Sequence, residues 1–152
     1  MFKIISLLMI TLFLIPVSSE VKLSKNNTLI TNNIYLLYIP KYNKNFNISF
    51  NINDLDKNLV CSLEEIKDFN KTILLFGHNN RNVFNFLYDL EIDDEIVLYV
   101  KDKKLKYYVS SKKIISVNDK SYLDISNNSE LRLFTCTLNK AERLVVIAKA
   151  NL

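Results

Sequence analysis

From Ile34 onward the chain is a series of short apolar runs, rich in β-branched and aromatic residues and separated by asparagine, aspartate and lysine. In Phe46–Ile52 apolar and polar side chains alternate strictly, which is the pattern of a half-buried strand. Strands are predicted at Ile34–Ile39, Phe46–Ile52, Thr72–Phe76, Glu95–Lys101, Leu105–Val117, Leu131–Thr135 and Arg143–Ala148. Seven or eight such strands predict an all-β domain, either a closed antiparallel barrel or a sandwich.

Helical patterns occupy little of the chain. Short helices are predicted only at Ser62–Phe69 and Val83–Leu90. The length of 152 residues, with 49% hydrophobic and 24% charged residues, suits one domain with a packed core. No internal repeat interrupts this pattern, so we expect a single folded unit.

The first twenty residues differ from the rest. An uncharged apolar run of fourteen residues, Ile4–Val17, follows Lys3. That length suits the central region of a signal peptide, and a short membrane anchor is the alternative. We therefore expect an exported protein, with residues 1–19 as signal peptide or anchor, 20–33 as a linker and 34–152 as the folded domain.

Composition excludes several classes of function. With Gly77 as its only glycine, the chain cannot contain a glycine-rich phosphate loop. The net charge of +4 comes with scattered lysines, so a nucleic-acid partner is not predicted. Two cysteines and one histidine make a zinc site improbable. A calcium set of Glu64, Glu65 and Asp68 is better explained as a solvated helix start, so no metal or other cofactor is predicted.

Three residues are poorly explained by structure alone. His78 is the only histidine and ends one apolar strand, Cys136 ends another, and Arg143 opens the last. Strand ends can meet at one rim of a barrel, where a thiol beside an imidazole becomes a thiolate nucleophile with a general acid. A guanidinium there would stabilise a tetrahedral oxyanion. The second thiol, Cys61, is expected to be a packed core residue.

The residues around these positions form recognisable motifs. Leu133-Phe134-Thr135-Cys136 resembles the T-L-x-T-C signature of the sortase family, with Arg143 at the head of the following strand as in that family. Thr72–Asn79 resembles the sortase strand that ends in the active-site histidine, and Tyr38–Lys41 is similar to the family's opening I-P-K motif. The resemblance runs from about Ile34 to the end of the chain. It departs from the signature at Arg132, which replaces a threonine, and at Asp93-Asp94, where the family usually has a glycine.

The resemblance implies a closed eight-stranded sortase-type β-barrel and a cysteine transpeptidase at the outer face of a bacterial membrane. Cys136 would form a thioester with an LPXTG-like sorting signal, His78 would protonate the leaving amine, and Arg143 would stabilise the oxyanion. Thr135 would orient the loop or the peptide. An amine of a peptidoglycan precursor or of another surface protein would then accept the acyl group.

The order of the candidate catalytic residues along the chain distinguishes a sortase from other cysteine enzymes. Papain-like enzymes place the cysteine before the histidine, and L,D-transpeptidases need a Ser-His-Gly-Cys cluster that Cys136 lacks. A pilin-polymerising sortase is disfavoured, because only about residues 18–33 could form its lid. The alternative from another class is an exported β-barrel binding or surface protein that keeps the fold with little or no turnover.

Overall fold

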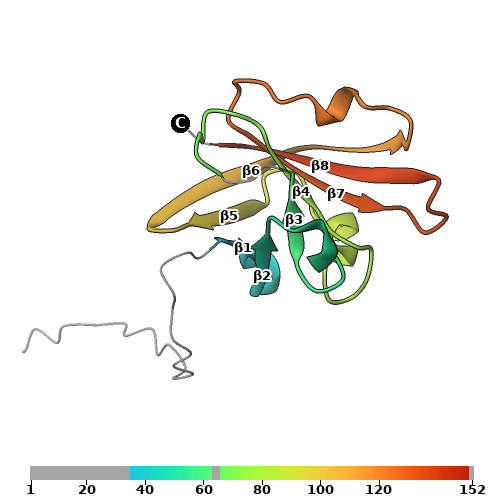
Figure 1. The fold of residues 1–152 in the computed structure, drawn as a ribbon, viewed down its shortest axis with the longest axis horizontal. Coiled ribbons are helices and arrows are strands. Elements are labelled where there is room, and N and C mark those ends of the chain that lie inside the picture. Colours follow the sequence, from blue (N-terminus) through green and yellow to red (C-terminus); the bar gives the residue numbers. More distant parts are fainter. Residues whose placement is uncertain (1–34, 63–65, 151–152) are drawn as a thin grey trace, which may run out of the picture.

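The apolar runs of the sequence form the strands of a closed β-barrel (Figure 1). The computed structural model describes residues 35–62 and 66–150. Its strands are β1 (Tyr35–Ile39), β2 (Lys44–Ser49), β3 (Leu59–Cys61), β4 (Ile73–Phe76), β5 (Glu95–Val100), β6 (Lys103–Ser116), β7 (Glu130–Cys136) and β8 (Glu142–Ala150). Around the barrel they follow the order β1-β2-β3-β4-β7-β8-β6-β5. The predicted eight-stranded barrel is therefore confirmed, and the sandwich is excluded.

Two pairs of neighbouring strands run parallel, which corrects the expected antiparallel barrel. β2 pairs with β3, and β4 pairs with β7, both in parallel. A parallel pair needs a connection that returns the chain to the same end of the sheet. The chain from β4 does so by way of β5 and β6 before it enters β7. As a result, β4 and β7 end at the same rim of the barrel.

The described helices are short 3₁₀ turns: η1 (Pro40–Tyr42), η2 (Ile52–Asp54), η3 (Asn85–Asp89) and η4 (Ser121–Leu123). The helix expected at Val83–Leu90 is only the 3₁₀ turn η3, since the backbone becomes extended at Leu90. Lys112 Nζ donates to the carbonyls of Tyr88 and Leu90 at the end of this turn. Among the described residues no helix is long and apolar enough to cross a membrane.

Several expected segments fall wholly or partly outside the described residues. The leader at 1–19 and the linker at 20–33 do so entirely. The helix expected at Ser62–Phe69 includes residues 63–65, which lie outside, while the residues at 66–68 are not helical.

Strand alternation builds two apolar layers. Inward side chains such as Leu75, Leu133 and Val146 are fully buried in the barrel interior. On the outer face Leu74, Phe134 and Val145 form a second cluster with Tyr122 against it. Cys61 is 3% exposed within the interior core, as its surroundings in the sequence predicted.

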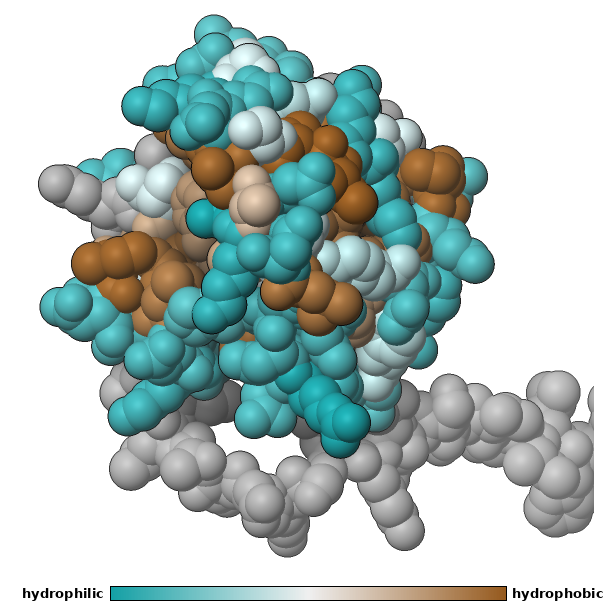
Figure 2. Space-filling model, turned by 90° about the vertical axis from the view of Figure 1, so that its right-hand side faces the viewer, coloured by the Kyte–Doolittle hydropathy of each residue, from teal (hydrophilic) through white to brown (hydrophobic). Residues whose placement is uncertain are grey.

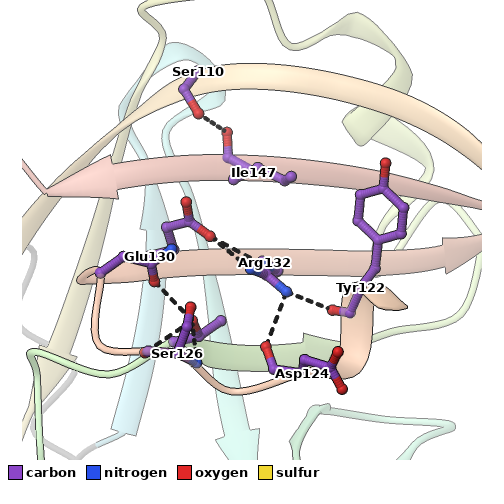
Figure 3. A network of polar contacts seen from close by, with 9 residues as sticks. Ser110, Tyr122, Asp124, Ser126, Glu130, Arg132 and Ile147 are labelled. Carbon is purple, nitrogen blue, oxygen red and sulfur yellow. Dashed lines mark hydrogen bonds and ion pairs between the residues drawn. The ribbon is translucent and has the colours of Figure 1, made fainter. Parts of the chain in front are cut away.

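The loop between β6 and β7, residues 117–129, is fastened to β7 by Arg132 (Figure 3). Arg132 Nη1 donates to the carbonyls of Tyr122 at 2.9 Å and Asp124 at 3.1 Å, and Nη2 donates to Glu130 at 2.8 Å. Both members of the Arg132–Glu130 pair are nearly buried. The arginine that departs from the sortase signature is therefore the anchor of this loop.

A second polar cluster joins η1, which connects β1 and β2, to the residues between η3 and β5. Lys41 Nζ lies 2.8 Å from Asp94 Oδ2 and 3.4 Å from Glu91 Oε2. Asp94 also accepts the Glu91 backbone N–H at 2.7 Å. Desolvation by burial acts to raise the pKa of Asp94, but the Glu91 N–H and Lys41 together lower that pKa below its ordinary value of 3.8.

Asp94→Asn should lower the stability of the barrel at neutral pH and hardly change it in acid. A carboxyl whose pKa is lowered by folding stabilises the fold above its unfolded pKa, and this contribution disappears as pH falls through the folded pKa. Urea unfolding of both proteins from pH 7 to pH 3 measures the effect, and the gap between their midpoints should narrow as the pH falls below about 3.8. A gap that is independent of pH would assign the loss to packing instead.

Candidate active site

The parallel pairing of β4 and β7 brings two candidate residues together. Phe76 and Phe134 are register partners, and the Gly77 N–H extends the ladder by donating to the Phe134 carbonyl at 3.0 Å. His78 and Cys136 each follow two residues after a partnered phenylalanine, so they leave the sheet side by side at one rim. Both are half-buried, and both line the same two surface hollows.

Arg143 reaches the same place from the other side of β7. Cys136 and Arg143 are register partners across the antiparallel β7–β8 pair, and partners directly opposite share a face of the sheet. The guanidinium Nη1 donates to the backbone carbonyls of Lys140 at 3.3 Å and Glu142 at 3.1 Å. Thus the turn that joins the two strands holds the arginine beside the thiol.

An apolar hollow of about 330 Å³ opens beside these three residues, and Ile52, Leu55, Phe76 and Phe134 supply its apolar lining. The rings of Phe76 and Phe134 stack with centroids 4.9 Å apart. Figure 2 views the end of the barrel at the right of Figure 1 and shows brown apolar patches there between teal hydrophilic side chains. Such a lining suits uncharged side chains of an extended peptide.

A second hollow of about 390 Å³ shares His78 and Cys136 with the first. It is called the polar hollow here for the side chains of Asp56, Asn79, Thr137 and Lys140, and the exposed Leu138 also lines it. Asp56 Oδ1 lies 3.0 Å from His78 Nε2. The carboxylate belongs to the turn between η2 and β3, and no motif in the sequence marks it. Sequence reasoning therefore missed Asp56 as a neighbour of the histidine.

Thr135 lies next to the thiol but faces away from it. It contributes to the lining of the apolar hollow, yet only 2% of the residue is exposed. Successive side chains of a strand point to opposite faces, so Thr135 is directed away from the face that carries Cys136. Its predicted role in orienting the peptide stays a prediction.

Gly77 is required by the space at the end of β4. A Cβ at this position would lie 2.6 Å from Phe84 Cδ2, 2.7 Å from Val83 Cγ1 and 2.9 Å from Leu59 Cδ2. The segment after His78 folds back over the strand end, with the Phe84 N–H donating to the His78 carbonyl at 3.1 Å. The only glycine of the chain thus allows this segment to cover β4 closely.

Gly77→Ala should destabilise the barrel by about 1–3 kcal/mol, the usual cost of overpacking a tight site. The added methyl group must displace Phe84 or Val83, and the displacement falls on the backbone next to His78. Urea unfolding measures the loss, and the rate of thioester formation should fall with it. Wild-type stability in this variant would show that the covering segment moves aside freely.

The described residues hold no group of three or more histidine, cysteine, aspartate or glutamate side chains placed to bind a metal ion. In the calcium set considered from the sequence, Glu64 and Glu65 lie outside the described residues. The third member, Asp68, lies 3.9 Å from Lys71 in an exposed ion pair.

Fold and site together define a closed β-barrel protein with a thiol, an imidazole and a guanidinium at one rim. The family model for the sortase domain matches residues 37–151, which is more than half of the chain. The chain therefore belongs to the sortase family, whose members are cysteine transpeptidases.

Solved structures of sortases share the fold. Sortase A from Corynebacterium diphtheriae superposes with a TM-score of 0.69 at 23% identity, covering 78% of this chain and 60% of that one. Sortase C1 from Streptococcus agalactiae gives 0.69 at 21% identity, covering 80% and 69%. Sortase A from Listeria monocytogenes gives 0.71 at 18% identity, covering 80% and 89%.

The chain spans 60% of the length of the Corynebacterium diphtheriae sortase A chain. Sortases A and C are both among the similar structures, so the likeness does not separate these two classes. No curated protein sequence matches the chain.

Proposed function

We propose that this chain cleaves an LPXTG-like sorting signal through a thioester on Cys136. It then transfers the acyl group to an amine of the cell wall or of another surface protein. The convergence of Cys136, His78 and Arg143 on one rim, beside the apolar hollow, carries the proposal. A thiol, an acid and an oxyanion donor are the groups that acyl transfer from an amide to an amine requires.

The first half of the reaction forms the thioester. The Cys136 thiolate attacks the scissile carbonyl carbon, and a C–S bond forms while the carbonyl oxygen becomes an oxyanion. Arg143 stabilises that charge with a guanidinium that stays protonated. When the intermediate collapses, the C–N bond breaks and the His78 imidazolium gives its proton to the leaving amine.

The second half restores the enzyme. An incoming amine attacks the thioester carbonyl, a new C–N bond forms, and the C–S bond breaks to return the Cys136 thiolate. An acceptor that arrives as an ammonium loses two protons in all. One of them returns His78 to its imidazolium form, and the other passes to water. Each step uses only the three side chains of the rim.

We also propose that the enzyme works outside the cell, held to the membrane or exported by residues 1–19. The uncharged apolar run Ile4–Val17 supports this placement, because its length suits a signal peptide or a short anchor. An enzyme in this position would meet sorting signals and wall amines as they leave the membrane.

Intact-protein mass spectrometry tests the reaction. The chain is mixed with a panel of LPXTG-like peptides, first alone and then with triglycine as the amine. The expected result is a peptide adduct on Cys136 that disappears when triglycine is added, while the joined product appears. A folded protein that forms no adduct with any peptide of the panel would contradict the proposal.

A further inference from the structure

We propose that Asp56 receives the ammonium group of the acyl acceptor in the polar hollow beside His78. This inference rests on the transpeptidase function proposed above and adds the binding site of the second substrate. The ligand class is a primary alkylammonium ion, such as the end of a lysine side chain or a peptide N-terminus.

The backbone holds Asp56 at the rim although its side chain is 86% exposed. The N–H groups of Lys57 and Asn58 donate to the Asp54 carbonyl at 3.0 and 2.9 Å, and these two bonds close a turn around Asp56. The Asp54 carboxylate in turn accepts the Ser49 hydroxyl at 2.6 Å, which ties the turn to the end of β2. The carboxylate of Asp56 is thus presented from a fixed turn and points to His78.

The two hollows differ in a way that suits two different substrates. They meet at His78 and Cys136, so each gives a separate approach to the reacting thiol. Lys140 lies in the polar hollow and Arg143 in the apolar one. Among the residues that the structure describes, Asp56 is the one acidic residue that lines either hollow. Asp56 therefore gives the polar hollow a carboxylate that an ammonium group can pair with, although Lys140 lies in the same hollow. The apolar hollow carries the cation Arg143 instead and is left to the sorting-signal peptide.

Thioester formation would remove the cationic partner of Asp56 just before the acceptor amine enters. The mechanism proposed above starts from the His78 imidazolium, and Asp56 Oδ1 lies 3.0 Å from His78 Nε2. Thioester formation takes the proton from His78 and leaves Asp56 without its cationic partner. The next cation to enter can be the acceptor ammonium, which binds Asp56 beside a neutral imidazole able to take its proton. Loss of that proton makes the amine nucleophilic and restores the ion pair.

Asp56→Asn tests this role in the full chain. At pH 7 triglycine is largely protonated at its amino group, whereas hydroxylamine is uncharged. The variant should raise the KM for triglycine about threefold to fivefold, as expected for one lost solvent-exposed ion pair. It should leave the KM for hydroxylamine within about twofold of wild type, while any slower thioester step, which uses the His78 that Asp56 contacts, lowers the turnover with both nucleophiles alike. Asp56→Glu, which keeps the carboxylate, should have a triglycine KM close to that of the wild type.

Asp102→Asn is the matched control, because it removes the same charge far from the site. Asp102 lies in the β5–β6 turn just before β6, whereas Ile115, which pairs with Arg143, lies near the other end of β6. An unchanged triglycine KM in Asp56→Asn would overturn the inference about Asp56, but it would not contradict the proposed transpeptidase function. An equal rise of the KM for both nucleophiles would also overturn it, since Asp56 would then act only through His78. A wild-type chain that forms no thioester would instead overturn the proposed function, and this inference with it.

Discussion

Cys136→Ala should abolish transpeptidation, by at least roughly 10⁴-fold, while the barrel stays folded. Removing the nucleophile of a covalent mechanism removes the thioester itself, and in comparable triads such losses reach this size or more. Cys136 is half-buried at a strand end, so its loss should cost less stability than the 2–5 kcal/mol typical of large core truncations. Intact-mass detection of the adduct and of the joined product measures activity, and urea unfolding measures stability.

Cys61→Ala is the matched control, since it removes the other thiol of the chain. Cys61 is buried in the interior core, so this variant should lose some stability and keep its activity. Equal product from Cys136→Ala and wild type would contradict a thioester at this position. It would favour the alternative of an exported barrel protein that keeps the fold without using the thiol.

The convergence of His78 and Cys136 could be expected from sequence, but its cause could not. Alternation and residue type reveal that a segment is a strand, and they do not reveal its direction relative to its neighbours. The parallel β4–β7 register that aligns the two residues depends on the long path through β5 and β6. The family motif supplied the convergence before any pairing was known.

Features that depend on only a few residues could not be predicted from the sequence. β3 is three residues long, too short for an alternating pattern, although its side chains are completely enclosed. Asp56 lies in a turn whose position depends on backbone hydrogen bonds to Asp54, and the contact with His78 joins residues 22 positions apart. Arg132 stood out as a departure from a motif, and only the fold reveals it as the anchor of the loop at 117–129.

Arg143→Ala should slow thioester formation by about 10²–10³-fold, the usual effect of removing one oxyanion donor. The side chain shares a face with Cys136 and is held by the backbone carbonyls of Lys140 and Glu142, so its charge lies on the face of the sheet where the proposed oxyanion would form. Single-turnover kinetics of adduct formation measures the effect. The loss should fall on the rate constant more than on peptide affinity, because the oxyanion exists only on the way to the thioester.

Arg143→Lys separates charge from geometry at the same position. Lysine keeps the positive charge but has no planar fork, so it cannot hold two turn carbonyls and still direct an N–H to the substrate. We expect an intermediate rate, nearer to alanine than to wild type. A lysine variant as fast as wild type would assign the effect of Arg143 to its charge alone. An alanine variant that loses peptide affinity at an unchanged rate would make Arg143 a substrate clamp, because its contact would then be equally strong in the bound peptide and in the transition state.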